Sequence, residues 1–94
     1  MRMIFFNAAW SAPGRLMEPT LARIARAYGW PFLRLEVAAW PELLKRYEVK
    51  TLPELILAHG EKVLGRWRGF YPEGVLRTEI EGILKGGTDD GNRG

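Results

Sequence analysis

The amino-acid sequence predicts a single α/β domain in the order strand, helix, strand, helix, strand, strand, helix. Three observations lead to this prediction. The short apolar run from Arg2 to Phe6 is typical of a buried strand. Apolar residues recur at helical spacing from Arg15 to Tyr28 and again from Val75 to Leu84. Between these stretches, His59-Gly60 separates two strand-like runs and indicates a hairpin.

The first helix is predicted from its spacing and its ends. Ser11 is a plausible N-cap, and Pro13 is tolerated in a first helical turn. Pro19 should kink the helix because it lacks an N–H and crowds the preceding turn. Gly29 should stop it. The apolar face follows the pattern i, i+4, i+7, i+11: Met17, Leu21, Ile24 and Tyr28.

The middle of the chain predicts a strand, a short helix and a second strand. Residues from Pro31 to Val37 form the strand, and Pro41 opens the helix. Pro53 must precede or edge the apolar run from Leu55 to Ala58, because it cannot donate a hydrogen bond within a sheet. The short helix should share one apolar face: Leu43, Leu44 and Tyr47.

The last third completes the domain. Lys62 to Arg68 should form the second arm of the hairpin, which Gly69 ends. Gly86-Gly87 should end the last helix, so residues 1–85 form the domain and residues 86–94 are expected to be a disordered polar tail. This order of elements favours an open sheet with two parallel strand connections and a C-terminal antiparallel hairpin.

The composition excludes several classes of function. The 94 residues contain no cysteine, which excludes disulfides, thiolate nucleophiles and thiolate metal sites. One histidine, His59, falls short of a metal shell, so no metal site is expected. The net charge of +3 is mild and its basic residues are spread along the chain, which argues against nucleic-acid binding.

Two further expectations concern the environment of the protein. The apolar run from Met3 to Phe6 is too short for a signal peptide or a membrane span, so we expect a cytoplasmic protein without membrane contact. The chain has no glutamine and only two asparagines, which matches the depletion of heat-labile residues in thermophile proteins.

Several segments resemble the thioredoxin family, in the family's order. The stretch from Ala9 to Arg15 resembles the segment Trp-Cys-Gly-Pro-Cys-Lys, with Ser11 and Gly14 at the cysteine positions. Pro19 matches the proline of the active-site helix. Further matches are Leu52-Pro53 with Leu55 to the cis-proline loop Ile-Pro-Thr-Leu, His59-Gly60-Glu61 to the Asn-Gly-Glu hairpin, and Gly69 to the glycine that ends the last strand.

This resemblance covers roughly residues 2 to 85 and implies the thioredoxin fold, with a central mixed four-stranded sheet flanked by helices. The chain departs from the family at Phe5, where thioredoxins place a buried aspartate that assists the second cysteine. It also begins directly with the central strand, without the family's additional N-terminal strand and helix. Because both sulfurs and their proton partner are replaced, we expect no thiol-disulfide exchange and simple packing for Phe5.

The resemblance also implies a binding surface, and three hypotheses for function remain open. The first is a redox-inactive module that binds a protein or peptide, or a second copy of itself, without a cofactor. The second is a transferase-like enzyme that binds glutathione or another thiol through Ser11. The third is a descendant of a thiol-disulfide oxidoreductase whose assignment as a thioredoxin rests on sequence similarity alone. The surface residues expected from the family are Trp10, Ser11, Thr51, Leu52, Pro53, Gly69 and Phe70, and Trp40 and Trp67 either widen this surface or lie in the core.

Other candidates for chemistry are weaker. Ser11 would need a base to act as a nucleophile, and His59 should lie at the opposite end of the sheet. No carboxylates have the pattern of a catalytic pair, and the glutamates considered are expected to be solvated charges: Glu18, Glu54, Glu79 and Glu81. We therefore expect no catalytic residue.

Overall fold

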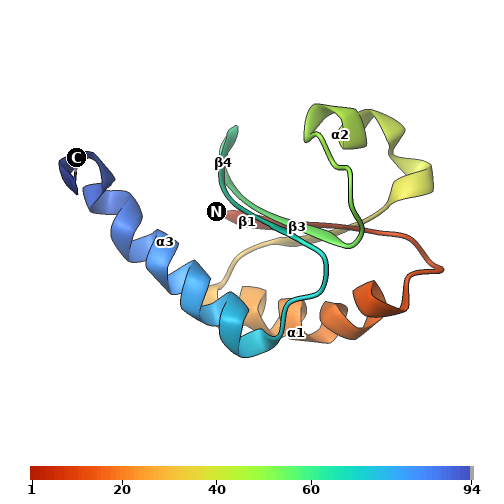
Figure 1. Ribbon diagram of the computed structural model, residues 1–94, viewed down its shortest axis with the longest axis horizontal. Coiled ribbons are helices and arrows are strands. Elements are labelled where there is room, and N and C mark those ends of the chain that lie inside the picture. The colour runs from red at the N-terminus through yellow and green to blue at the C-terminus, as the bar shows by residue number, and fades with distance from the viewer. Residues whose placement is uncertain (94) are drawn as a thin grey trace.

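The computed structural model describes the backbone of residues 1–93 and the side chains of residues 1–86. The order of elements is the predicted one, with one additional turn of 3-10 helix (Figure 1). The elements are β1 (Arg2–Asn7), α1 (Ala12–Tyr28), β2 (Phe32–Glu36), η1 (Val37–Ala39), α2 (Pro41–Arg46), β3 (Glu54–His59), β4 (Lys62–Arg68) and α3 (Glu73–Arg93).

The four strands form one mixed sheet in the order β2-β1-β3-β4. Strands β1 and β2 are parallel, and the pairs β1/β3 and β3/β4 are antiparallel. The mixed four-stranded sheet is confirmed, but the expectation of two parallel connections is wrong. Helix α2 has 6 residues and is therefore only about 9 Å long, shorter than a typical strand. The chain accordingly enters β3 from the end of the sheet at which β2 finishes.

The helices cover both faces of the sheet. Helices α1 and α3 lie on one face and α2 lies on the other (Figure 1). Alternate residues of β1 serve the two faces, so Met3 and Phe5 pack toward α1 and α3 while Ile4 and Phe6 pack toward α2. Phe5 is 1% exposed, which confirms that it packs in the core.

Helix α1 begins and ends as its residues predict. The Ser11 side chain accepts a hydrogen bond from the Gly14 N–H and caps the helix, and proline occupies its first turn. Gly29 ends the helix with φ +73°, a left-handed conformation that glycine adopts without steric cost. Pro19 lies inside the helix.

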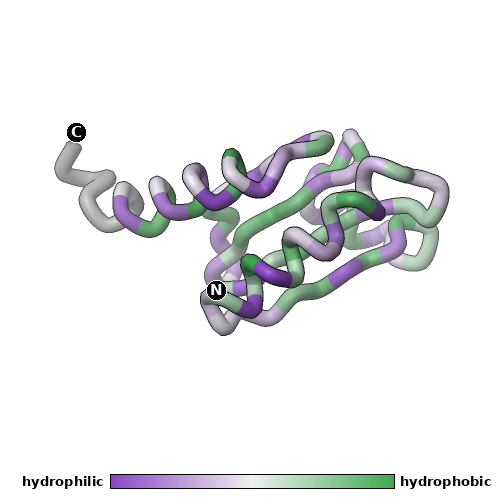
Figure 2. The backbone as a smooth tube through the Cα atoms, turned by 90° about the horizontal axis from the view of Figure 1, so that it is seen from below, coloured by the Kyte–Doolittle hydropathy of each residue, from purple (hydrophilic) through white to green (hydrophobic). Residues whose placement is uncertain are grey.

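Helix α3 continues beyond the predicted end. It runs to Arg93, past Gly86-Gly87, because glycine weakens a helix without blocking its hydrogen bonds. The prediction of a disordered tail concerns residues 86–94, most of which lie outside the described side chains, and it stays a prediction. Figure 2 shows hydrophobic residues along the strands and an alternation of polar and apolar residues along α3. Among the described residues, no helix is long and apolar enough to cross a membrane.

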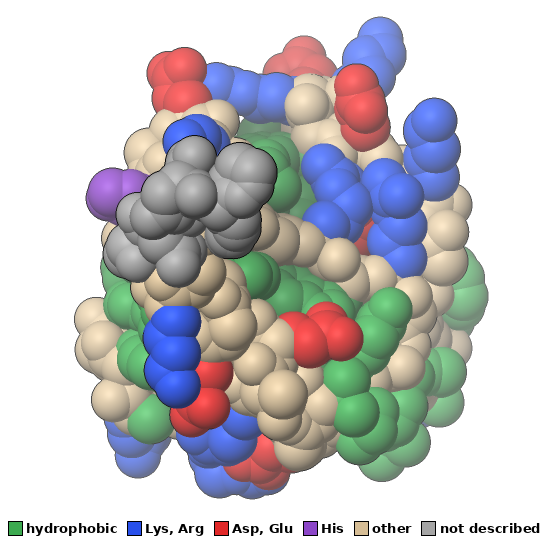
Figure 3. All heavy atoms as spheres, turned by 60° about the vertical axis from the view of Figure 1, so that its left-hand side comes forward, with side chains coloured by type: hydrophobic (Ala, Val, Ile, Leu, Met, Phe, Trp, Pro, Cys, Tyr) green, Lys and Arg blue, Asp and Glu red, His purple; other side chains and the backbone are tan. Residues whose placement is uncertain are grey.

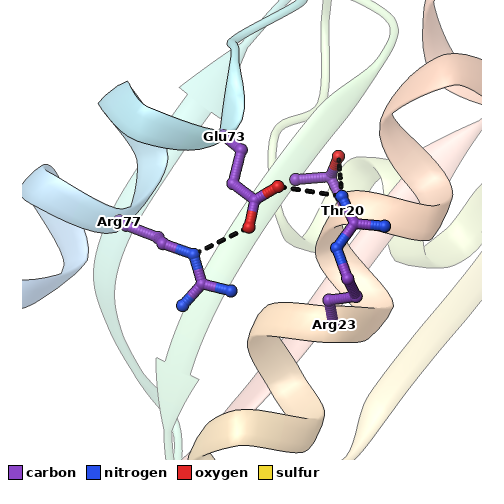
Figure 4. A network of polar contacts seen from close by, with 4 residues as sticks. All are labelled: Thr20, Arg23, Glu73 and Arg77. Carbon is purple, nitrogen blue, oxygen red and sulfur yellow. Dashed lines mark hydrogen bonds and ion pairs between the residues drawn. The ribbon is translucent and has the colours of Figure 1, made fainter.

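Helices α1 and α3 are joined by a network of charged side chains (Figure 4). Arg23 of α1 donates to Glu73 Oε1 at 2.8 Å, and Arg77 donates to Glu73 Oε2 at 2.8 Å. Arg23 also donates to Thr20 Oγ1 at 3.3 Å. The hydrogen bonds from Arg23 and Arg77 hold the pKa of Glu73 below its ordinary value.

Candidate functional site

The expected site lies where three connections meet at one end of the sheet. The pairing places Phe6 of β1, Glu54 of β3 and Arg68 of β4 side by side. The segment after β1, the segment before β3 and the segment after β4 therefore leave the sheet at the same end. Gly69 donates its N–H to the Pro53 carbonyl at 2.7 Å, which fastens two of these segments together. The peptide bond before Pro53 is cis, as the resemblance implies.

Two aromatic side chains at this end of the sheet are largely in solvent. Trp10 is 77% exposed and Phe70 is 52% exposed. Among the described residues, no ring contact joins either one to the other. We use the term Trp10 surface for the residues of these segments: Trp10, Thr51, Leu52, Pro53, Gly69 and Phe70.

The remaining tryptophans that the sequence singled out behave differently from each other. Trp67 is 3% exposed and belongs to the core, so it does not widen the Trp10 surface. Its Nε1 donates to Glu79 Oε1 at 2.5 Å. Trp40 is 48% exposed, between η1 and α2.

The two positions of the family's cysteines are closed to solvent. Ser11 is 5% exposed, and its hydroxyl oxygen accepts the Gly14 N–H at 3.4 Å. The side chain thus serves as the cap of α1. Gly14, at the second position, is buried as well. Neither residue offers an accessible nucleophile, because glycine has no side chain and a serine hydroxyl stays protonated at a helix N-terminus, where the pKa of a thiol is lowered.

Asn7 occupies the space that a side chain at position 14 would need. A β-carbon on Gly14 would lie 2.0 Å from Asn7 Oδ1 and 2.2 Å from Asn7 Cγ, too close for any pair of unbonded atoms. The Oδ1 atom is buried and has no hydrogen-bond partner among the described atoms. The Asn7 side chain therefore fills the space next to the position of the second cysteine.

A buried carboxylate supports the Pro53 loop from the α2 side. Glu54 is 0% exposed, and its Oε2 accepts a short hydrogen bond from Arg66 and lies 3.5 Å from Arg68 Nε. The same Arg66 nitrogen donates to the Tyr47 carbonyl at 2.7 Å, at the end of α2. The expectation that Glu54 is a solvated charge is wrong, because two arginines of β4 compensate its burial.

The sequence matches the model of a known protein family. The model of the family described as Thioredoxin matches residues 1–82. The chain belongs to the thioredoxin family. The family assignment and the thioredoxin fold are therefore confirmed, on a member that carries no cysteine.

Relatives and solved structures agree with this assignment. A thioredoxin of Alicyclobacillus acidocaldarius is 28% identical over 88% of this chain and 81% of its own length. Chloroplastic thioredoxin Y2 of Arabidopsis thaliana is 27% identical, but the chain spans only 51% of its length. The structure of mitochondrial thioredoxin 3 from Saccharomyces cerevisiae is 28% identical, with a TM-score of 0.73 over 84% of this chain and 74% of that one. Thioredoxin 1 of Thermosipho africanus shares the fold, with a TM-score of 0.82 at 20% identity over 90% of this chain and 96% of that one.

Two cavities of this thioredoxin-family chain lie apart from each other, and neither is lined by a residue of the Trp10 surface. A cleft of about 390 Å³ adjoins the segment after β1 and carries charges of both signs from Arg15, Glu18, Arg34 and Glu36. A more apolar groove of about 660 Å³ lies between β4 and α3, on the face shown in Figure 3. The residues described form no cluster of metal-ligating side chains.

Other sequence candidates lie away from the site or are paired. His59 is exposed at the hairpin end of the sheet, opposite Ser11, as expected. Glu18 pairs with Arg34 at 3.3 Å. Neither His59 nor Glu18 therefore lies beside Ser11 as a catalytic partner.

Sequence reasoning missed Asn7 and Glu54. No periodic pattern marks a side chain such as that of Asn7, which lies at the end of β1 and turns back against helix α1. Glu54 carried a signal, since a charged residue that opens a buried strand needs partners, and Arg66 and Arg68 lie on the next strand. Counting from the hairpin turn would have misplaced them, because the register shifts between Leu57 and Ala58.

Proposed function

We propose that this chain is a redox-inactive thioredoxin-family protein that binds an extended segment of a protein partner through the Trp10 surface. The observation that carries the proposal is the exposure of Trp10 and Phe70, 77% and 52%, beside the Pro53 loop of a chain without cysteine. Large aromatic side chains are frequent anchors in protein contacts. Their placement in solvent brings no benefit to the fold of the chain itself.

The backbone around Pro53 supports an extended partner. Thr51 is exposed and Leu52 is half-buried, so the segment just before β3 lies at the surface. A peptide that adds to such a segment gains main-chain hydrogen bonds, and its side chains find specificity on the neighbouring surface. The hydrogen bond from Gly69 to Pro53 and the pairing of Arg66 with Glu54 hold this segment in place. A preorganised surface loses less entropy on binding.

The test is a selection of peptides from a displayed library on the immobilised protein, followed by calorimetry with a synthetic peptide. We expect Trp10→Ala together with Phe70→Ala to weaken binding by about thirtyfold or more, the effect of losing anchor residues. Val63→Ala is the matched control, because Val63 is a 40% exposed apolar residue at the hairpin end of the sheet. Equal affinity of the double variant and the unchanged protein would contradict the proposal.

The glutathione hypothesis is tested in the same calorimeter. The structure offers little to favour it, because the Ser11 hydroxyl is 5% exposed and caps α1. We expect no heat from reduced glutathione at about millimolar concentration, the range in which a weak small-ligand site would respond. Saturable heat that Ser11→Ala abolishes would favour the transferase-like alternative instead.

A further inference from the structure

Strand β2 forms an open edge of the sheet. Its only neighbour among the described strands is β1, in the order β2-β1-β3-β4. An exposed edge strand presents a row of unpaired N–H and C=O groups to which another strand can add. Leu33 on this strand is 43% exposed, on the α2 face that the short α2 leaves uncovered. The edge therefore offers both backbone groups and apolar surface to a partner.

The hydrogen bonds of β1 determine which backbone groups of β2 face outward. Met3 donates its N–H to the Pro31 carbonyl at 2.9 Å, so Pro31 points its carbonyl toward β1. Along a strand, successive residues point their N–H and C=O groups to alternate sides. The backbone N–H and C=O groups of Leu33 and Leu35 thus point toward β1. Those of three other residues point away from the sheet, at its open edge: Phe32, Arg34 and Glu36.

Only one antiparallel register of β2 with its own copy matches opposite charges. If the two-fold axis passes through Leu35, Arg34 lies opposite Glu36 of the copy, and Glu36 lies opposite Arg34 of the copy. The backbone N–H and C=O groups of Arg34 and Glu36 point to the open edge of β2, as a hydrogen-bonded antiparallel pair requires. An axis at Arg34 would instead place two arginines opposite each other, which is unfavourable. An axis at Leu33 would leave Glu36 opposite Trp30.

The side chains are available for this arrangement. Arg34 and Glu36 are two residues apart on β2, so their side chains project from the same face of the sheet. Arg34 is 63% exposed and contacts Glu18 from one side only. Glu36 is exposed and has no ion pair among the described side chains. On the opposite face, the same register would place Leu33 beside the start of η1 of the copy, where Val37 follows the end of β2.

We propose that two copies of this chain associate through the outer edges of β2, antiparallel, about a two-fold axis at Leu35. The two sheets then continue into one. This contact does not use the Trp10 surface, so it stands independently of the proposed function. About four backbone hydrogen bonds and two ion pairs form a small interface, and such interfaces are weak. We expect a dissociation constant on the order of 100 µM, rising with salt as ion pairs are screened.

The first test is sedimentation equilibrium from about 10 µM to about 1 mM protein, where an interface of this size is populated. Arg34→Glu and Glu36→Arg should each abolish the dimer, because like charges then face each other. The double variant Arg34→Glu/Glu36→Arg should restore it. Thermal unfolding of each variant checks that these exposed substitutions leave the fold intact. A monomer at the highest concentration, or a double variant that stays monomeric, would overturn the proposal.

The second test uses the absence of cysteine from the chain. In the proposed register Leu35 lies opposite Leu35 of the copy, at a Cα separation of about 4.5 Å that a disulfide can bridge. Leu35→Cys should therefore give a disulfide-linked dimer in air. Leu33→Cys is the matched control, because the two copies of residue 33 would lie about 13 Å apart along the strands. Equal cross-linking of both variants would exclude this register.

Discussion

At the scale of single residues, Asn7 and Gly14 act as a pair. The Asn7 side chain fills the space next to the Gly14 Cα, and a β-carbon there would lie 2.2 Å from Asn7 Cγ. A side chain at position 14 therefore requires the Asn7 side chain to shift. Because the interior is close-packed, we expect that shift to cost stability unless a smaller residue stands at position 7.

Gly14→Ala should lower the free energy of unfolding by about 1–3 kcal/mol, the usual effect of overpacking a buried site. Asn7→Ala/Gly14→Ala should recover most of that loss, since the methyl group then enters the space that the amide vacates. Urea denaturation of the two single variants and the double variant gives the coupling energy between the sites. Additive effects would show that the Asn7 side chain moves aside freely and does not define the site.

At the scale of elements, the side chain of Arg66 connects three of them. Arg66 of β4 donates to Glu54 at the start of β3 and to the Tyr47 carbonyl at the end of α2. The segment between α2 and β3 carries Thr51, Leu52 and Pro53, so the two hydrogen bonds of Arg66 fix both ends of this part of the Trp10 surface. A buried ion pair is costly to break, because removing one partner leaves the other charge without compensation.

Arg66→Met should destabilise the protein by about 3 kcal/mol, near the lower end for a broken buried pair because Arg66 is partly exposed. Arg68→Met is the matched control on the same strand, and we expect a loss of about 1 kcal/mol or less because Arg68 is more exposed and lies farther from Glu54. Chemical denaturation of both variants measures the difference. Similar losses would mean that the two arginines share the compensation of Glu54 equally.

At the scale of the whole molecule, the two helices of one layer are fastened by Glu73. Its carboxylate joins Arg23 of α1 to Arg77 of α3 (Figure 4). It also lies in the first turn of α3, where negative charge is favourable. The lowered pKa of Glu73 means that folding stabilises the ionised form of its carboxylate relative to the protonated form.

The stability that Glu73 contributes should therefore be present above the ordinary pKa of 4.5 and disappear as the pH falls through the lowered pKa. Glu73→Gln should melt below the unchanged protein near neutral pH, and the two melting temperatures should converge in strong acid. Glu61→Gln, at the exposed hairpin turn, serves as the control for the loss of one negative charge, because Glu61 has no ion pair among the described side chains. A difference that persists in acid would assign the effect to packing.

Much of this architecture was predictable from the sequence. The spacing of Met17, Leu21 and Ile24 predicts the buried face of α1, and Ser11 and Gly29 predict its ends. The Pro53 and Gly69 matches predict the cis peptide bond and the end of β4. The spacing and the caps of α1 are local signals, because periodicity and capping act over a few residues. The Pro53 and Gly69 matches come from the resemblance to the family. The candidate site could be located in the same way, from the family's ordered motifs.

The order of the elements and the absence of cysteine from a thioredoxin-family chain follow from the sequence, since both can be read without knowing any long-range contact. Four further features required the folded structure: the antiparallel direction of β3, the burial of Trp67 and Glu54, the contact of Asn7 with Gly14 and the open edge of β2. These features depend on strand register and on close packing between distant segments. Neither is encoded in the spacing of neighbouring residues.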